Sequence, residues 1–124
     1  MKDQSWPHFS REELQCKFDP SQCAMNPEFM ERIEKLRVEW GKPLRVTSAF
    51  RSKLHPRERT KPKLGRHAHG EAIDFALYGA EALDFLKLAL DMGFRGLGLH
   101  QRSQFSERFI HVDHRTDVPA LWTY

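Results

Sequence analysis

Residues 67–77 read HAHGEAIDFAL and pass from a polar turn into a predicted β-strand. Beyond the glycine the side chains alternate, so that Asp74 lies on one face of the strand and Ile73 on the other. Gly70 lets the chain bend back in front of the strand, which keeps His67 close to it. The segment therefore predicts a strand with a carboxylate on one face and an imidazole at its start.

The flanking segments predict a mixed fold. A helix is expected over residues 27–40, because Asn26 suits its N-cap, Pro27 suits its first position, and apolar residues recur at spacings of three and four. A short helix is expected after the capping box at Ser10, and a second main helix at 80–92, where Leu83, Leu86 and Leu90 recur at helical spacing. Further strands are expected at 44–48, 96–100 and 108–113. Trp122 and Tyr124 are expected to fold back onto the body. The predicted class is α+β, a small antiparallel sheet with two main helices.

Length and composition fit one domain over residues 1–124. The chain has 40% hydrophobic and 30% charged residues, which suits a single core and is too ordinary for wholesale disorder. No apolar run approaches the roughly 20 residues of a spanning helix, so membrane insertion is not expected. Cys16 and Cys23 are too few for a four-thiolate zinc site, and they are interpreted as two free thiols or as a disulfide formed after release.

Two polar stretches carry the residues that can do chemistry. On the predicted strand over residues 108–113, His111 and Asp113 share one face, and Asp74 can meet His111 if the two strands pair. With His67 this makes two imidazoles and one carboxylate, a donor set suited to zinc with a fourth position left for water. From the spacing alone, solvated histidines and a strand-end carboxylate remain open interpretations.

Four ordered segments carry a family resemblance. His67-x-x-Gly70-x-Ala72-x-Asp74 resembles the H-x-x-G-x-A-x-D signature of the zinc D-Ala-D-Ala carboxypeptidase family, which includes D,D-dipeptidases and phage L-alanyl-D-glutamate endolysins. The other three segments are KPLRVTSAFRS at 42–52, GFRGLG at 93–98, and FIHVD at 109–113, which resembles the closing motif of the C-terminal carboxypeptidase-domain branch. The resemblance covers nearly the whole chain and implies a hedgehog/DD-peptidase-like fold.

The resemblance implies roles for residues at matching positions. The zinc ligands would be His67, Asp74 and His111. Arg51 would match an arginine that holds a substrate carboxylate through two parallel hydrogen bonds, which a lysine could not reproduce. Ser48, in the same matched segment, either lines the site or ends its strand.

The general base is not fixed by the resemblance, because Arg108 stands where several relatives have an acid. Asp113 shares the strand face of His111 and could take a proton from water, or it could instead orient a ligand histidine. Glu107 lies four residues before His111 with the same parity and is the second candidate. His100 follows a glycine-containing strand and could hydrogen-bond a developing oxyanion.

Residues 51–66 form a basic loop with seven Lys or Arg and one acid, Glu58. The loop could simply be solvated, or it could form a basic wall beside the site that attracts anionic peptidoglycan. The net charge of the chain is only +3, and the loop has no aromatic residue for base stacking, so nucleic acid is not an expected partner.

These observations predict a zinc-dependent peptidase that hydrolyses a peptide bond in bacterial peptidoglycan stem peptides, as a D,D-carboxypeptidase or an endopeptidase. Because residues 1–8 lack the apolar core of a signal peptide, synthesis in the cytoplasm is expected. Action at the cell wall would then follow release, or the protein would be virion-associated and encoded by a phage or prophage. The alternative is a non-catalytic zinc-stabilised binding or structural module on the same fold.

Overall fold

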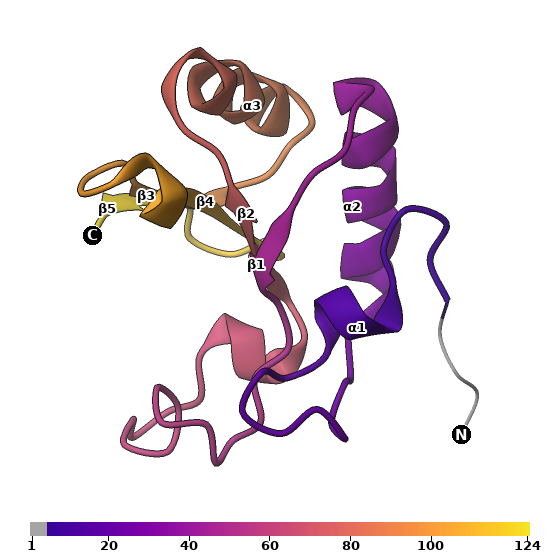
Figure 1. Cartoon of the computed structure of the whole chain (residues 1–124), viewed down its shortest axis with the longest axis vertical. Helices are drawn as coiled ribbons and strands as arrows, with labels where there is room; N and C mark the ends of the chain where they lie inside the picture. Colours follow the sequence, from indigo (N-terminus) through magenta and orange to yellow (C-terminus); the bar gives the residue numbers. More distant parts are fainter. Residues whose placement is uncertain (1–4) are drawn as a thin grey trace.

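In the computed structural model, which describes residues 5–124, a five-stranded sheet is flanked by two main helices (Figure 1). The first four residues, part of the stretch examined above for a signal peptide, lie outside this range. The helices are α1 (Arg11–Leu14), α2 (Pro27–Trp40), α3 (Gly79–Asp91) and the 3-10 turns η1 (Arg66–His69) and η2 (Phe105–Glu107). The strands are β1 (Val46–Ser48), β2 (Ala72–Ala76), β3 (Gly96–His100), β4 (Phe109–Asp113) and β5 (Ala120–Thr123).

The sheet has the strand order β1-β2-β4-β3-β5. Neighbouring strands are antiparallel except for β5, which runs parallel to β3 at the edge. The predicted α+β class is therefore confirmed, and the antiparallel sheet gains a parallel edge strand that the sequence did not indicate. Trp122 does fold back onto the body, as a member of β5.

The predicted helix starts are confirmed for α1 and α2, and the predicted end is confirmed for α2. The Ser10 side chain accepts a hydrogen bond from the amide of Glu13, whose carboxylate accepts one from the amide of Ser10 in return. The Asn26 side chain accepts from the amide of Phe29 at the start of α2, and Gly41 ends that helix in the left-handed conformation.

Helix α3 buries a different stripe from the expected one. Leu83 and Leu90 are 70% and 41% exposed, whereas Phe85, together with two alanines, is buried. The Phe85 ring lies 5.5 Å from that of Trp40 and 5.6 Å from that of Phe75, measured between centroids. Of the three expected leucines only Leu86 packs against the core. The helix instead turns its single aromatic side chain, Phe85, toward the sheet and α2.

The hydrophobic core fills one face of the sheet. Alternate strand residues pack with buried side chains of α2 and α3; they include Ile73, Phe75, Leu97, Ile110 and Val112. The intervening residues, among them Asp74 and His111, therefore lie on the opposite face. Cys16 is buried and Cys23 half-buried, and both are free thiols.

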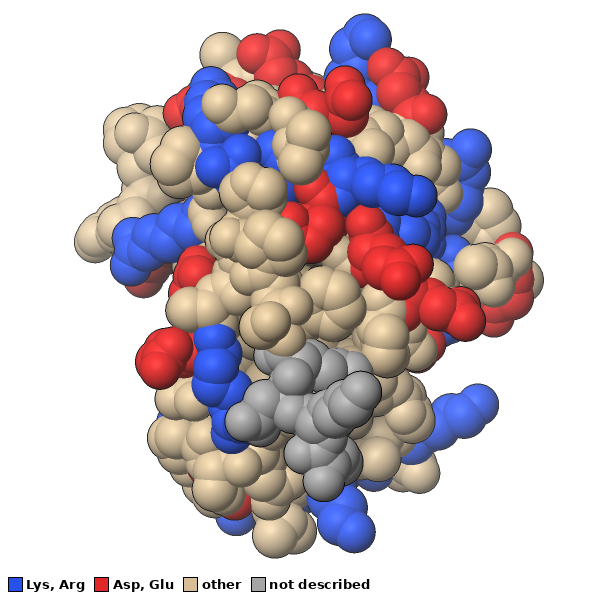
Figure 2. Space-filling model, turned by 90° about the vertical axis from the view of Figure 1, so that its right-hand side faces the viewer, with Lys and Arg blue, Asp and Glu red and all other residues tan. Residues whose placement is uncertain are grey.

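Two surface features complete the description of the fold. On the side where α2 lies, basic and acidic side chains are interspersed over much of the upper half of the view (Figure 2). Within residues 5–124, no helix combines the length and apolar character needed to cross a membrane.

Candidate metal centre and active-site cleft

A cross-strand row of side chains builds the floor of the site. The register pairs Asp74 of β2 with His111 of β4, His111 with Gly98 of β3, and Gly98 with Trp122 of β5. Directly paired residues project to the same face of a sheet. The convergence of Asp74 and His111 that strand pairing was expected to produce is therefore present.

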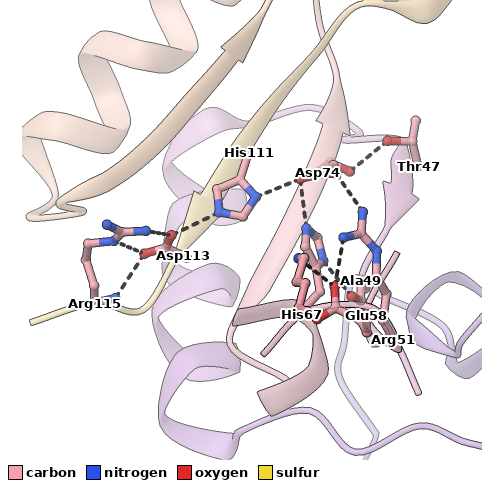
Figure 3. Close-up of polar contacts among 10 residues, drawn as sticks. Thr47, Ala49, Arg51, Glu58, His67, Asp74, His111, Asp113 and Arg115 are labelled. Atoms are coloured by element: carbon pink, nitrogen blue, oxygen red, sulfur yellow. Dashed lines mark hydrogen bonds and ion pairs between the residues drawn. The ribbon is translucent and has the colours of Figure 1, made fainter. Parts of the chain in front are cut away.

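His67 reaches this row from η1, just before β2. Its Nε2 lies 3.2 Å from Oδ1 of Asp74, and Nδ1 of His111 lies 3.0 Å from the same oxygen (Figure 3). The three residues are at most 5% exposed, and the atoms they offer lie within 4.8 Å of one another. Gly70, with φ of 70°, makes the bend, and a side chain there would collide with the backbone of Ala24.

The outer nitrogen of each imidazole is fixed by an oxygen acceptor. Nδ1 of His67 lies 2.7 Å from the carbonyl oxygen of Ala49, and Nε2 of His111 lies 2.9 Å from Oδ2 of Asp113. Because these oxygens accept, the outer nitrogens carry the hydrogens. When both rings are neutral, the inner nitrogens direct lone pairs at the Asp74 oxygen, an arrangement that a divalent cation satisfies.

The charges inside the site respond to this geometry. Burial by itself raises the pKa of the Asp74 carboxyl, but its contacts with His111 and His67 outweigh that effect and hold the pKa well below its usual range. Burial lowers the pKa of His111, and hydrogen bonding to Asp113 and Asp74 raises it above its usual value. A carboxylate ionised between two nitrogen donors is a zinc-type ligand set.

Arg51 lies beside the centre and has a buried partner that sequence analysis did not assign. Its guanidinium is 3.8 Å from Asp74 Oδ2 and 3.4 Å from Oε2 of Glu58. The Glu58 side chain is fully buried and also accepts from the Gly65 amide at 2.9 Å and from Lys61 Nζ at 3.1 Å. Glu58 was visible in the sequence only as the single acid of the basic loop.

These residues open onto a cleft of about 490 Å³. Three aromatic side chains, Phe109, Trp122 and Tyr124, lie along it. The charged residues that line it are Arg51, Arg57, Lys61, Arg66, Arg115, Glu58 and Asp74. Basic groups therefore outnumber acids, which supports the interpretation of the basic loop as a wall beside the site.

Four predicted site residues do not line the cleft: Ser48, His100, Glu107 and Asp113. Ser48 is the strand partner of Asp74 and is half-buried at the end of β1. His100 lies behind the lining, stacked on Phe109 at 5.0 Å between ring centroids. Glu107 is exposed in η2.

Asp113 is close to the centre but lies behind His111. It is fully buried, with Oδ2 toward His111 and both oxygens accepting from Arg115 (Figure 3). This position corresponds to the alternative role considered for Asp113, the orientation of a ligand histidine. Its assignment as the base, like that of Glu107, stays a prediction.

Comparison with known proteins agrees with this geometry. Residues 7–113 match the family model described as peptidase M15. The chain is 30% identical over 97 residues to proteins named peptidoglycan L,D-endopeptidase MepK in Escherichia coli K12, Escherichia coli O157:H7 and Shigella flexneri. The alignment covers 73% of this chain and 51% of each relative, so the chain spans about half the length of these proteins. The chain belongs to the peptidase M15 family.

Proposed function

We propose that the protein is a zinc-dependent peptidase that hydrolyses a peptide bond in bacterial peptidoglycan stem peptides. The observation that carries the proposal is the convergence of His67, Asp74 and His111 on one point at the floor of a cleft. The family supports peptidase chemistry, and the relatives, which are named as peptidoglycan L,D-endopeptidases, support peptidoglycan as the substrate and favour an endopeptidase over a carboxypeptidase.

His67, Asp74 and His111 would hold the zinc ion. When bound there, zinc would polarise the scissile carbonyl and lower the pKa of water toward about 7. The protein fixes the ligands in advance, because Ala49 and Asp113 hold the two imidazoles by their outer nitrogens.

Arg51 would bind a substrate carboxylate. Its side chain is only 12% exposed and lines the cleft beside Asp74, so a carboxylate that reaches it lies close to the centre. Glu58 lies 3.4 Å from one Nη atom of the guanidinium, and Arg51 is among the residues that line the cleft. The other basic lining residues would attract stem peptides, which carry several carboxylates.

We also propose that the protein acts at the cell wall. A peptidoglycan substrate places the activity at the cell wall, reached after release or from a virion. A phage or prophage origin is compatible with the resemblance to endolysins.

Digestion of purified peptidoglycan, with and without a chelator, tests the proposal. We expect zinc-dependent release of peptides, and the fragment masses will distinguish an endopeptidase from a D,D-carboxypeptidase. His67→Ala should abolish zinc binding and release, whereas His69→Ala is the matched control, because His69 is exposed two residues away. Undiminished digestion after chelation would refute the zinc-dependent mechanism.

The alternative module gives a different result in the same experiment. It predicts bound zinc and a large loss of thermal stability on chelation, but no product from purified wall.

A further inference from the structure

We propose that Arg115 is a positioning residue for the metal centre, acting through Asp113 on the ligand His111. The inference rests on the proposed zinc site. Arg115 follows the residues that match the family model, which end at residue 113. Its role is therefore read from the structure of this chain.

Arg115 grips Asp113 with a two-pronged contact. Its Nε donates to Oδ1 at 2.9 Å and its Nη2 donates to Oδ2 at 2.8 Å, while its backbone amide donates to Oδ1 at 3.1 Å. Oδ2 is also the atom that lies 2.9 Å from Nε2 of His111. Three donors from one residue thus set the orientation of the carboxylate that sets the orientation of the imidazole.

Gly96 provides the space for this contact. It pairs with Asp113 in the β3–β4 register, and a Cβ at position 96 would stand 1.9 Å from Oδ1 of Asp113 and 2.5 Å from Nε of Arg115. On the other side of Asp113 the paired residue is Ala72, which is also small. The contact between Arg115 and Asp113, called the fork below, therefore lies where the neighbouring residues on both strands are small.

The same segment contacts His111 from a second direction. The Trp122 ring lies 5.0 Å from the His111 ring, and the Arg115 guanidinium lies 5.1 Å over the indole, both measured to ring centroids. Gly98 leaves room for the indole, since a Cβ there would come within 2.6 Å of it. Residues 115–122 therefore hold His111 both by its hydrogen-bond partner and by its ring face.

Removing the fork should loosen His111 rather than unfold the protein. Without the Arg115 side chain, the buried Asp113 carboxylate would keep its hydrogen bond with His111. It would lose the two side-chain donors that fix the plane of the carboxylate. Partners of metal-ligating histidines typically contribute about 10–100-fold to metal affinity. We expect Arg115→Ala to weaken zinc binding by a factor in this range, and Arg115→Lys to recover only part of it, because lysine cannot reproduce the fork.

Competition with a chromophoric zinc chelator measures the affinity of the purified full chain, and thermal melting of the apo protein measures folding. Arg108→Ala is the matched control: this arginine lies next to β4, but its side chain contacts Ser103 and Phe105 instead of the site. A second readout is the ¹⁵N chemical shift of the His111 ring, which reports whether Nε2 still carries the hydrogen.

The outcomes separate this inference from the proposed function. Weaker zinc binding by Arg115→Ala, with an unchanged control and a partial recovery of wall digestion at saturating zinc, supports the positioning role. Wild-type affinity in folded Arg115→Ala overturns it, as does wild-type affinity in Arg115→Lys if the alanine variant does not fold. Failure of the wild-type chain to bind zinc would instead overturn the proposed metal site.

Discussion

Replacing Glu58 with glutamine should destabilise the fold by about 2–3 kcal/mol at neutral pH. The Glu58 side chain is fully buried, and its oxygens accept from Gly65, Lys61 and Arg51. Glutamine keeps an acceptor for the Gly65 amide, but it turns an NH₂ group toward one of two cations. Hydrogen bonds to charged groups contribute about 1.5–3 kcal/mol each to the free energy of unfolding. Because the Lys61 side chain is 44% exposed, its contact with Glu58 should contribute no more than the lower of these values.

Urea unfolding of the metal-free protein, followed by tryptophan fluorescence, measures this loss. The control is Glu81→Gln, because Glu81 lies 2.6 Å from Lys42 but both side chains are at least 50% exposed. That variant should lose no more than about 0.5–1 kcal/mol. Equal losses in the two variants would refute the argument that burial makes Glu58 the anchor of the basic loop.

The loss should also depend on pH with a definite sign. Burial raises the pKa of the Glu58 carboxyl, but hydrogen bonds from Gly65 and Lys61 outweigh it and leave the pKa below its ordinary value. The stabilisation by ionised Glu58 is then fully present above the unfolded pKa of about 4.3 and is lost as the pH falls through the folded value. The difference between wild type and Glu58→Gln should therefore shrink in acid, and a difference that grows below pH 4 would contradict this assignment.

Three further predictions test other parts of the structure. Gly98→Ala should lose about 1–3 kcal/mol in urea unfolding, because the indole of Trp122 must move; wild-type stability would show that the indole does not occupy that space. Glu107→Gln should leave stability within about 0.5 kcal/mol because the residue is exposed; a loss of wall digestion would identify Glu107 as the reacting acid, and an unchanged rate would exclude it. Phe85→Ala should lose about 3–5 kcal/mol and exposed Leu83→Ala much less in the same unfolding assay, and equal losses would contradict the orientation of α3.

Local signals explain which elements were predictable. The caps of α1 and α2 depend on side chains within three residues of the helix start, so sequence alone was sufficient. Strand β5 was missed because it lies at the edge of the sheet and its residues are only half-buried or exposed, so its alternation is weak. The buried stripe of α3 depends on packing against Phe75 and Trp40, which helical periodicity does not specify.

The candidate metal ligands were more predictable from the sequence than the residues around them. Strand alternation and one assumed pairing were enough to bring Asp74 and His111 together, and the register confirms that pairing. Glu58 and Arg115 could not be assigned, because each acts through a loop or turn geometry without period. A single acid within a basic loop was nevertheless a usable signal for Glu58, since an isolated carboxylate among cations is often their common partner.

The position of Asp113 shows why shared parity did not decide its role. Residues two apart on a strand point to the same face, but they belong to different cross-strand rows. His111 stands in the row of Asp74, Gly98 and Trp122, which opens onto the cleft, whereas Asp113 stands in the row of Ala72 and Gly96. Small neighbours would normally leave a cavity, but here they admit the side chain of Arg115 and bury the carboxylate. The two glycines of β3 therefore have separate consequences: Gly98 leaves room for the Trp122 ring beside His111, and Gly96 leaves room for the Asp113 carboxylate that contacts the outer nitrogen of His111.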